Sequence, residues 1–404
     1  MPTIRLRCTA RAISALTSLA AIVALGATAA PSTAATQVGL MDPAYAAASP
    51  EAYWADVDAL RPAFLRYEVH WNEIAPTKPV KQRDPADPAY QWGYLDDVVR
   101  EAAVHGYTGC DLIATVWRTP RWAAVVKSPY NYANTPNLQQ FRNFVAAAAT
   151  RYSGSYDPDG VEGPQAPLPQ IACWEIWNEP NFNGALRPQR KGRTLVSAIN
   201  YTRLLNGAYA EIKAVGRRYA FESQVIGGAL YRQRSPKGVG PVAFMQAMKA
   251  RGARFDVLSI HPYNGIPRLG VHDGEPGRGT VWPNIAIGNF GLFQAEVNRL
   301  WRNQRFPIWI TEFGWQTKTG RQDQYAITEQ QQARFLKQSI DLFKTQYRRV
   351  NRITWFLIKD EPVVSTDGRQ NTWQSGFRRL NGTKKPSYAA WQKLTGVAKR
   401  APAR

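Results

Sequence analysis

Short apolar runs recur eight times along the chain, and helical stretches separate them. Strand and helix in alternation are typical of a parallel sheet covered by helices. Eight repeats within 404 residues predict an α/β fold, a (β/α)8 TIM barrel. The strand-like runs span residues 37–41, 63–69, 110–117, 171–177, 224–230, 255–260, 307–313 and 352–358.

Helical periodicity lies between these runs. Residues 137–152 place apolar side chains on one helical face. Thr328 followed by Gln331 fits a capping box, which opens a helix between the seventh and eighth runs. Residues 385–394 are expected to form a final helix after the last strand.

The N-terminus has the pattern of an export signal. Arg5, Arg7 and Arg11 precede the apolar run 12–25, and small residues follow at 27–29. We therefore expect a secretory signal peptide at 1–35, a barrel at 36–396 and a basic tail at 397–404. A retained N-terminal anchor is the alternative. No second apolar span is present, so the mature protein is expected to be extracellular and free of the membrane.

The chain carries a net charge of +21 at pH 7, and removal of three signal arginines would leave +18. This charge favours anionic partners such as an acidic polysaccharide. A bias toward arginine that serves only solubility explains it equally well. No nucleic-acid-binding motif is recognised, so no nucleic-acid partner is predicted, and a monomer is expected.

Two cysteines, Cys110 and Cys173, remain after the signal. Each lies near the start of a predicted strand, and those strands are expected to be neighbours. A disulfide and two buried thiols both remain open, because pairing depends on the direction of each Cα–Cβ bond. The chain has no C-x-x-C or H-E-x-x-H motif and only four histidines, so neither a metal site nor a cofactor is predicted.

Two apolar strands end in glutamate. CWEIWNEPN (173–181) places Glu179 where the fourth strand stops, and PIWITEFGW (307–315) places Glu312 at the end of the seventh. Alternation would put Glu175, Trp177 and Glu179 on one face, although we expect an irregular strand end. Barrel active sites lie at the carboxyl ends of the strands, and two facing carboxylates indicate glycosidic bond chemistry.

The motifs WNEPN (177–181), HPY (261–263) and TEFGW (311–315) resemble those of the retaining glycoside hydrolases of clan A. LRYEVHWNEIAP (65–76) and VWRTPRWA (116–123) are most similar to glycoside hydrolase family 39, with family 5 as a near neighbour. The likeness follows the motif order through nearly the whole mature chain.

This resemblance implies that Glu179 is the general acid/base and Glu312 the nucleophile of a double displacement. It places Arg66, at the end of the second strand, beside the nucleophile, where it would lower the pKa of Glu312. Tyr263 would donate to the same carboxylate. Burial beside Trp177 would raise the pKa of the acid.

The resemblance also implies which side chains meet the sugar. Asn178 would bind the 2-hydroxyl, His261 would lie beside the pocket, and Trp355 would form the floor of the cleavage subsite. Tryptophans after strand ends are candidates for sugar stacking. Glu175 is expected to be a buried partner of Arg66. The full substrate-binding set is Arg66, Trp71, Trp117, Asn178, His261, Tyr263, Trp315 and Trp355.

Family 39 xylosidases carry an added β-domain after the barrel, whereas this chain ends soon after the eighth strand. We therefore expect an endo-acting secreted glycosidase acting on a polysaccharide or oligosaccharide, which the positive charge suggests is acidic. A non-catalytic carbohydrate- or cell-wall-binding protein on the same barrel is the alternative from another class. A transglycosylase, which passes the same covalent intermediate to a sugar, is a second alternative.

Overall fold

The computed structural model describes residues 36–125, 131–158, 167–233, 238–317, 326–362, 365–366, 369–370 and 373–396. The predicted signal peptide at 1–35 and the predicted tail at 397–404 both lie outside these residues. In the described part of the chain, none of the helices is both long and apolar enough to span a membrane.

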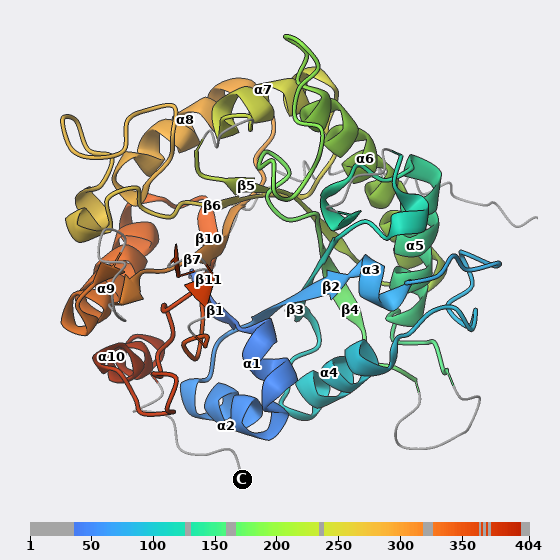
Figure 1. Ribbon diagram of the computed structural model, residues 1–404, viewed down its shortest axis with the longest axis horizontal. Helices are drawn as coiled ribbons and strands as arrows, with labels where there is room; N and C mark the ends of the chain where they lie inside the picture. The colour runs from blue at the N-terminus through green and yellow to red at the C-terminus, as the bar shows by residue number, and fades with distance from the viewer. Residues whose placement is uncertain are drawn as a thin grey trace, which may run out of the picture. The chain divides into compact units, whose positions relative to one another are not determined.

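Eight parallel strands close into a barrel, as the sequence predicts. The strands meet in the order β1-β10-β7-β6-β5-β4-β3-β2, and Figure 1 shows them as a central ring with helices around it. Their bounds are β1 Gln37–Met41, β2 Leu65–His70, β3 Gly109–Trp117, β4 Ile171–Ile176, β5 Gln224–Tyr231, β6 Val257–His261, β7 Ile308–Phe313 and β10 Val350–Phe356.

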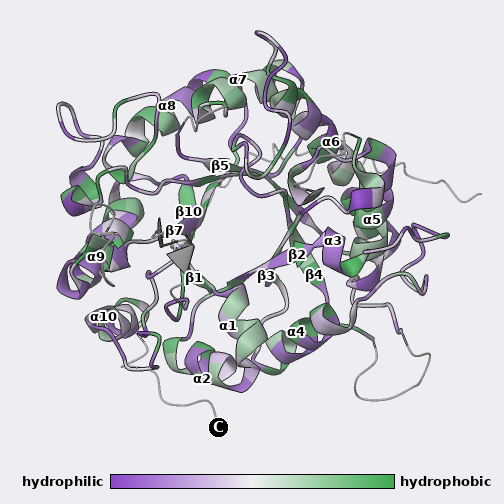
Figure 2. Cartoon of the chain, in the orientation of Figure 1, coloured by the Kyte–Doolittle hydropathy of each residue, from purple (hydrophilic) through white to green (hydrophobic). Residues whose placement is uncertain are grey.

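The longer helices pack on the outside of the ring and carry both hydrophobic and hydrophilic residues (Figure 2), whereas α1 lies at the cavity mouth. The apolar sides of the helices meet the outward-facing side chains of the strands, which makes one continuous core. The bounds are α1 Pro43–Ala48, α2 Pro50–Leu60, α3 Trp71–Ile74, α4 Gly93–Val104, α5 Leu138–Arg151, α6 Val196–Arg218, α7 Pro241–Ala250, α8 Phe290–Leu300, α9 Glu329–Gln346 and α10 Pro386–Thr395.

The loops between the barrel strands and helices contain short elements. These are the 3-10 turns η1 Arg121–Ala123, η2 Asn131–Ala133, η3 Pro267–His272 and η4 Ile287–Asn289, and the short strands β8 Gln316–Thr317, β9 Ala326–Ile327, β11 Ser365–Thr366 and β12 Arg369–Gln370.

Local sequence signals set several boundaries correctly. The capping box at α9 is present, with the Thr328 side chain accepting from the Gln331 backbone and the Gln331 side chain accepting in return. The last barrel strand differs from the prediction, because β10 begins and ends two residues before the expected 352–358. This shift moves Trp355 from the middle of the strand to its penultimate position.

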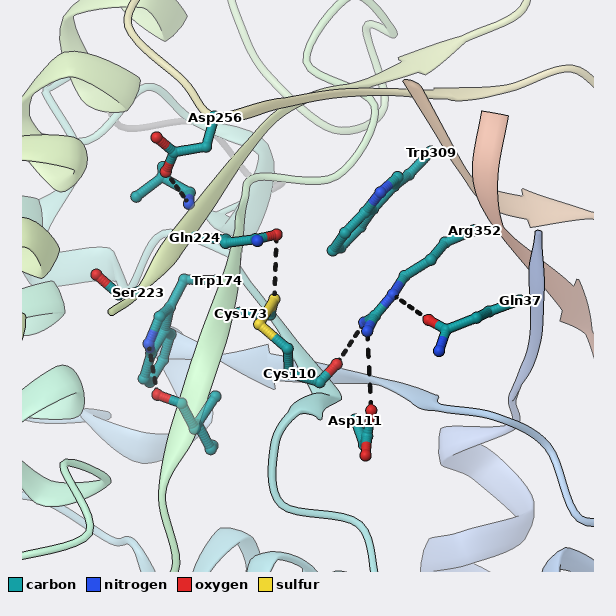
Figure 3. The surroundings of a disulfide bond; sticks show 12 residues. Gln37, Cys110, Asp111, Cys173, Trp174, Ser223, Gln224, Asp256, Trp309 and Arg352 are labelled. Atoms are coloured by element: carbon teal, nitrogen blue, oxygen red, sulfur yellow. Dashed lines mark hydrogen bonds and ion pairs between the residues drawn. A yellow bond between two sulfur atoms is a disulfide. The ribbon is translucent and has the colours of Figure 1, made fainter. Parts of the chain in front are cut away.

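A compact apolar cluster fills the barrel at the end where the strands begin. It contains side chains from six strands or the residues just before them: Phe64, Ile113, Cys173, Ile226, Val257 and Trp309. Cys110 joins Cys173 in a disulfide, with 4.7 Å between the Cα atoms, which settles the question that the sequence left open. Figure 3 shows this disulfide near Trp309 and Arg352, whose guanidinium reaches Asp111 and the carbonyl of Cys110.

Candidate active site

The fourth strand ends in an irregular turn that aims Glu179 into the barrel mouth. β4 stops at Ile176, and Trp177 and Glu179 both have positive φ angles, 70° and 46°. Such backbone is strained for residues other than glycine and persists only where the surroundings hold it. The Glu179 amide donates to Ala229 O at 3.0 Å, which ties the turn to β5.

This turn corrects the predicted alternation. Trp177 does not share a face with Glu179, because its indole nitrogen donates to Ala185 O and its ring packs on Phe141 of α5. The Trp177 ring therefore does not supply the burial of the Glu179 side chain that the sequence predicts. The expected irregularity of the strand end is confirmed.

Arg66, from β2, connects a carboxylate of β4, a carboxylate of β7 and the Asn178 amide that follows β4. Its guanidinium donates from Nε to Glu175 Oε2 and from Nη1 to Glu312 Oε1, both at 2.7 Å, and from Nη2 to Asn178 Oδ1 at 3.0 Å. Charge-assisted bonds of this kind are short and directional. Arg66 is the second residue of β2 and not its end, so it lies beneath the glutamates and holds them from below.

Glu175 is a buried partner of Arg66, as expected. It also accepts from Thr115 Oγ1 at 2.8 Å and from Ser259 Oγ at 2.7 Å. Its charge is thus fully engaged inside the barrel, and it does not line the cavity described below.

Tyr263 and His261 complete the surroundings of the pair. The Tyr263 hydroxyl donates to Glu312 Oε2 at 3.2 Å. His261 is fully buried, with Nδ1 3.0 Å from Glu179 Oε1 and Nε2 3.1 Å from Thr311 Oγ1. Burial, reinforced by the charge of Arg66, lowers the pKa of His261 well below its usual value, so the ring is neutral and can direct one N–H at Glu179.

Burial dominates the titration of both glutamates. It raises the pKa of Glu312 to about 7, even though Arg66 acts in the opposite direction. It also raises the pKa of Glu179 well above its usual value, and repulsion from Glu312 adds to the effect. Arg66 does act to lower the pKa of Glu312, as expected, but burial outweighs it. Because Arg66 donates to Glu312 and not to Glu179, the geometry favours Glu312 as the ionised carboxylate and Glu179 as the protonated one.

Glu179, His261 and Glu312 have a spacing that metal ligands can also have. Each offers one ligand atom, and these three atoms lie within 4.8 Å of one another. The Arg66 guanidinium, however, already bonds Glu312 directly, and a buried cation at this distance disfavours a second one. The residues fit a proton-transfer site better than a metal site.

A cavity of about 1300 Å³ opens above these residues at the carboxyl ends of the strands. Both Glu179 and Glu312 line it, together with Asn178 and Tyr263. Its volume exceeds the range of roughly 300–1,000 Å³ that is usual for small-ligand pockets. The site therefore has room for more than one sugar ring.

The predicted tryptophans divide into two groups. Trp117, at the end of β3, and Trp315, just after β7, line the cavity. Trp71 does not: it is fully buried and stacks on Phe144 of α5, outside the barrel wall. Trp355 does not either, because it faces outward from β10 and stacks on Phe377.

Phe356 and Trp373, which were not predicted, line the cavity where Trp355 was expected. Phe356, the next residue on β10, lines the cavity, since neighbours on a strand point to opposite faces. Trp373 lies against Phe356 and Tyr263, with ring centroids 5.4 Å and 5.2 Å apart, and also lines the cavity. The sequence signal that could have predicted this contact is the tryptophan itself, which stands in the loop after the eighth strand.

A second missed group lies at the end of β2. Glu68 lines the cavity, and its Oε2 is 2.9 Å from His70 Nε2, while Glu73 Oε2 is 3.0 Å from His70 Nδ1. Burial acts to raise the pKa of Glu68, but His70 and Arg66 outweigh it and hold the pKa below its usual value. The cavity thus contains an ionised carboxylate besides the central pair.

The barrel has the same fold as several solved glycosidase structures. A family 39 glycoside hydrolase from Bacteroides cellulosilyticus WH2 aligns with a TM-score of 0.62 and 18% identity, over 91% of this chain and 65% of that one. A monomeric β-xylosidase from Caulobacter crescentus CB15 aligns at 0.57 and 19% identity, over 90% and 69%. A fungal β-1,4-galactanase aligns at 0.55 and 13% identity, over 89% and 100%.

At these identities the structural likeness shows the fold, and the chain spans about two thirds of the length of the family 39 enzyme. No curated protein matches the sequence. A family model described as glycosyl hydrolase catalytic core matches residues 129–379, which is more than half of the chain and includes both Glu179 and Glu312. The chain therefore belongs to the glycosyl hydrolase catalytic core family.

Proposed function

We propose that this protein hydrolyses O-glycosidic bonds with retention of configuration, by double displacement. The observation that carries the proposal is the spacing of the pair: an oxygen of Glu179 and an oxygen of Glu312 lie within 4.8 Å. Retaining enzymes hold their two carboxyl groups about 5–5.5 Å apart, whereas inverting enzymes leave about 6.5–9.5 Å for a water molecule.

In this proposal Glu312 attacks the anomeric carbon and Glu179 donates a proton to the departing oxygen. Glu179 then removes a proton from water, which displaces the sugar from Glu312. Arg66 and Tyr263 hold the Glu312 carboxylate in place for attack, and His261 orients Glu179. Asn178, fixed by Arg66, lies at the cavity wall where it can meet a sugar hydroxyl.

The substrate we propose is a neutral glycan with several sugar units, cleaved within the chain. The size of the cavity supports more than one bound ring, and Trp117 and Trp373 supply aromatic surface for stacking, whereas Trp315 is buried against Phe335 and Trp355. Among the described residues of the cavity wall, glutamates outnumber arginines, with Glu68, Glu73 and Glu361 besides the central pair. An acidic sugar would be repelled there.

We also propose that the protein is exported. The basic and apolar pattern of the first residues supports this, and so does the disulfide between Cys110 and Cys173, because disulfides persist in oxidising compartments. Proteomics of the culture medium that recovers a chain beginning near residue 36 would test the proposal, and recovery of only full-length cell-associated protein would contradict it.

Trapping of the covalent intermediate tests the catalytic proposal. Purified protein is incubated with 2-deoxy-2-fluoro glycosides of the gluco, xylo and galacto series, and peptides are analysed by mass spectrometry. A glycosyl adduct on Glu312 is expected, and Glu312→Gln should form none. The matched control is Glu296→Gln on α8, whose carboxylate pairs with Arg299 away from the cavity. An adduct elsewhere, or oligosaccharide products of inverted configuration, would refute the proposal.

A further inference from the structure

Six exposed basic side chains lie at the end of the barrel opposite the cavity. Lys249 stands at the end of α7, and the loops that lead into β6, β7 and β10 carry the other five, which are Arg251, Arg254, Arg302, Arg305 and Arg348. None of the six forms an ion pair with a carboxylate of the described residues. Asp256, the acidic group in the loop before β6, already pairs with Lys213 at 2.8 Å. This surface is therefore uncompensated.

A hollow of about 450 Å³ lies within this surface. Tyr209 of α6 forms one wall, residues 253–255 before β6 form the second, and residues 304–306 before β7 form the third. The hollow is separate from the catalytic cavity, since it shares no lining residue with it and lies where the strands begin.

Aromatic rings, and not acids, hold the guanidinium groups at the hollow. The Arg254 guanidinium lies 4.6 Å from the centre of the Tyr209 ring. Arg349 lies 4.8 Å from the centre of the Phe306 ring, and burial, together with the charge of nearby Arg305, lowers its pKa. Arg349 also donates to the Phe306 carbonyl and to Asn298, so its N–H groups are engaged. The Arg254 guanidinium has no carboxylate partner among the described residues, and its N–H edges match a carboxylate in a two-pronged contact.

The same hollow offers apolar surface to a sugar ring. Phe255 and Phe306 pack edge to face with centroids 4.8 Å apart, and both line it. Gln304 adds an amide that can bond hydroxyl groups. A bilayer surface would need exposed apolar side chains to insert, whereas these two rings are half-buried.

We propose that this hollow binds carboxylate-bearing sugar units of an acidic polysaccharide, as a binding site independent of the catalytic cavity. Arg254 and Arg305 contact the carboxylate, and the rings of Phe255 and Phe306 contact the sugar face. The protein is then held on an acidic polymer by one end of the barrel while the opposite end remains open to a neutral glycan.

Binding of the full chain to polygalacturonate tests this site. All proteins carry Glu312→Gln so that no polymer is cleaved, and dissociation constants are measured by calorimetry at physiological salt. Arg254→Glu with Arg305→Glu should weaken binding at least tenfold. The control, Arg121→Glu with Arg193→Glu, makes the same charge change at exposed arginines on loops at the cavity end, and should retain affinity within about twofold.

When Glu312 is retained, the variant with Arg254→Glu and Arg305→Glu should cleave a small soluble glycoside as fast as the parent protein does. Failure of the binding site and failure of the proposed hydrolysis are therefore distinguishable. Three results would overturn the proposal: no binding of polygalacturonate by the parent protein, equal weakening by the control pair, or equally tight, Arg254/Arg305-dependent binding of polyphosphate, duplex DNA or phosphatidylglycerol vesicles. The last would mark a surface that responds to charge alone.

Discussion

The two ends of the barrel treat charge in opposite ways. At the carboxyl ends of the strands, Glu175 and Glu312 are buried against one arginine, Arg66, and Glu179 lies partly buried beside them. At the amino ends, the interior is apolar and closed by a disulfide, and the charged groups are arginines and lysines exposed on the rim. At the first end, burial raises the pKa values of Glu179 and Glu312. At the second end, burial lowers the pKa values of Arg349 and Arg352, and the six basic side chains around the hollow are exposed.

This difference separates stability from chemistry within one sheet. Buried carboxylates are destabilising unless paired, so the catalytic end depends on a single guanidinium. The opposite end gains its stability from packing and a covalent link, which need no charge. Changes at one end should therefore be felt little at the other, and the predictions below test that independence in order of decreasing effect.

The largest effect is expected from Glu179→Gln. Loss of the general acid should lower kcat/KM on a polymer by about 10²–10⁴-fold, and less on aryl glycosides with good leaving groups. Activity of the parent protein should rise as Glu312 ionises near pH 7, and fall at higher pH as Glu179 loses its proton. The variant should keep the acid limb and lose the alkaline limb. An alkaline limb that persists in the pH–rate profile would contradict the assignment.

Arg66→Met should reduce the free energy of unfolding by about 3–5 kcal/mol, because it leaves Glu175 and Glu312 buried without a cation. The comparison is Arg352→Met at the opposite end. Arg352 lies between Phe64 and Trp309. Its acidic partner Asp111 is half exposed, and their charged groups are 3.7 Å apart. We expect about 1 kcal/mol there. Equal losses in urea unfolding would mean that the two ends do not differ as proposed.

Replacement of Cys110 and Cys173 by serine should lower stability by up to about 4 kcal/mol, since the disulfide closes a loop with a sequence separation of 63. At temperatures where the variant is folded, kcat and KM should stay unchanged, because the link lies at the end away from the cavity. Urea unfolding and steady-state kinetics on one preparation provide the check. A folded variant with lowered kcat would reveal coupling between the ends.

The smallest effect is expected at the aromatic residues. Trp373→Ala should raise KM about tenfold with a smaller change in kcat, because the ring lines the cavity without touching the glutamates. Trp71→Phe, a change in the wall between barrel and helices, should leave KM unchanged and lower stability by about 1–2 kcal/mol. The opposite pattern would restore the sequence-based assignment of Trp71 to the substrate.

The positions of the strands and helices could be predicted from the sequence, but the direction in which individual side chains point was predicted less accurately. The fourth strand was expected at 171–177 and runs from Ile171 to Ile176. The eighth was expected two residues late, a shift that leaves the two faces of a strand unchanged because side chains alternate with a period of two. Trp355 was assigned to the cavity floor by the family resemblance, but it stacks on Phe377 outside the barrel, and Phe356 and Trp373 line the cavity instead. Trp71 was assigned to the substrate because it follows a strand end, and a position after a strand end does not specify direction.

The sequence by itself determined the order of strands and helices, and it placed two glutamates at the ends of strands four and seven. Such patterns are local, since they follow from backbone geometry over a few residues. Only the tertiary structure decided that Arg66 meets Glu175 and Glu312, that Cys110 pairs with Cys173, and that Arg254 and Arg305 come together at one hollow. Those features depend on residues far apart in the chain, whose relative directions are fixed when the barrel closes.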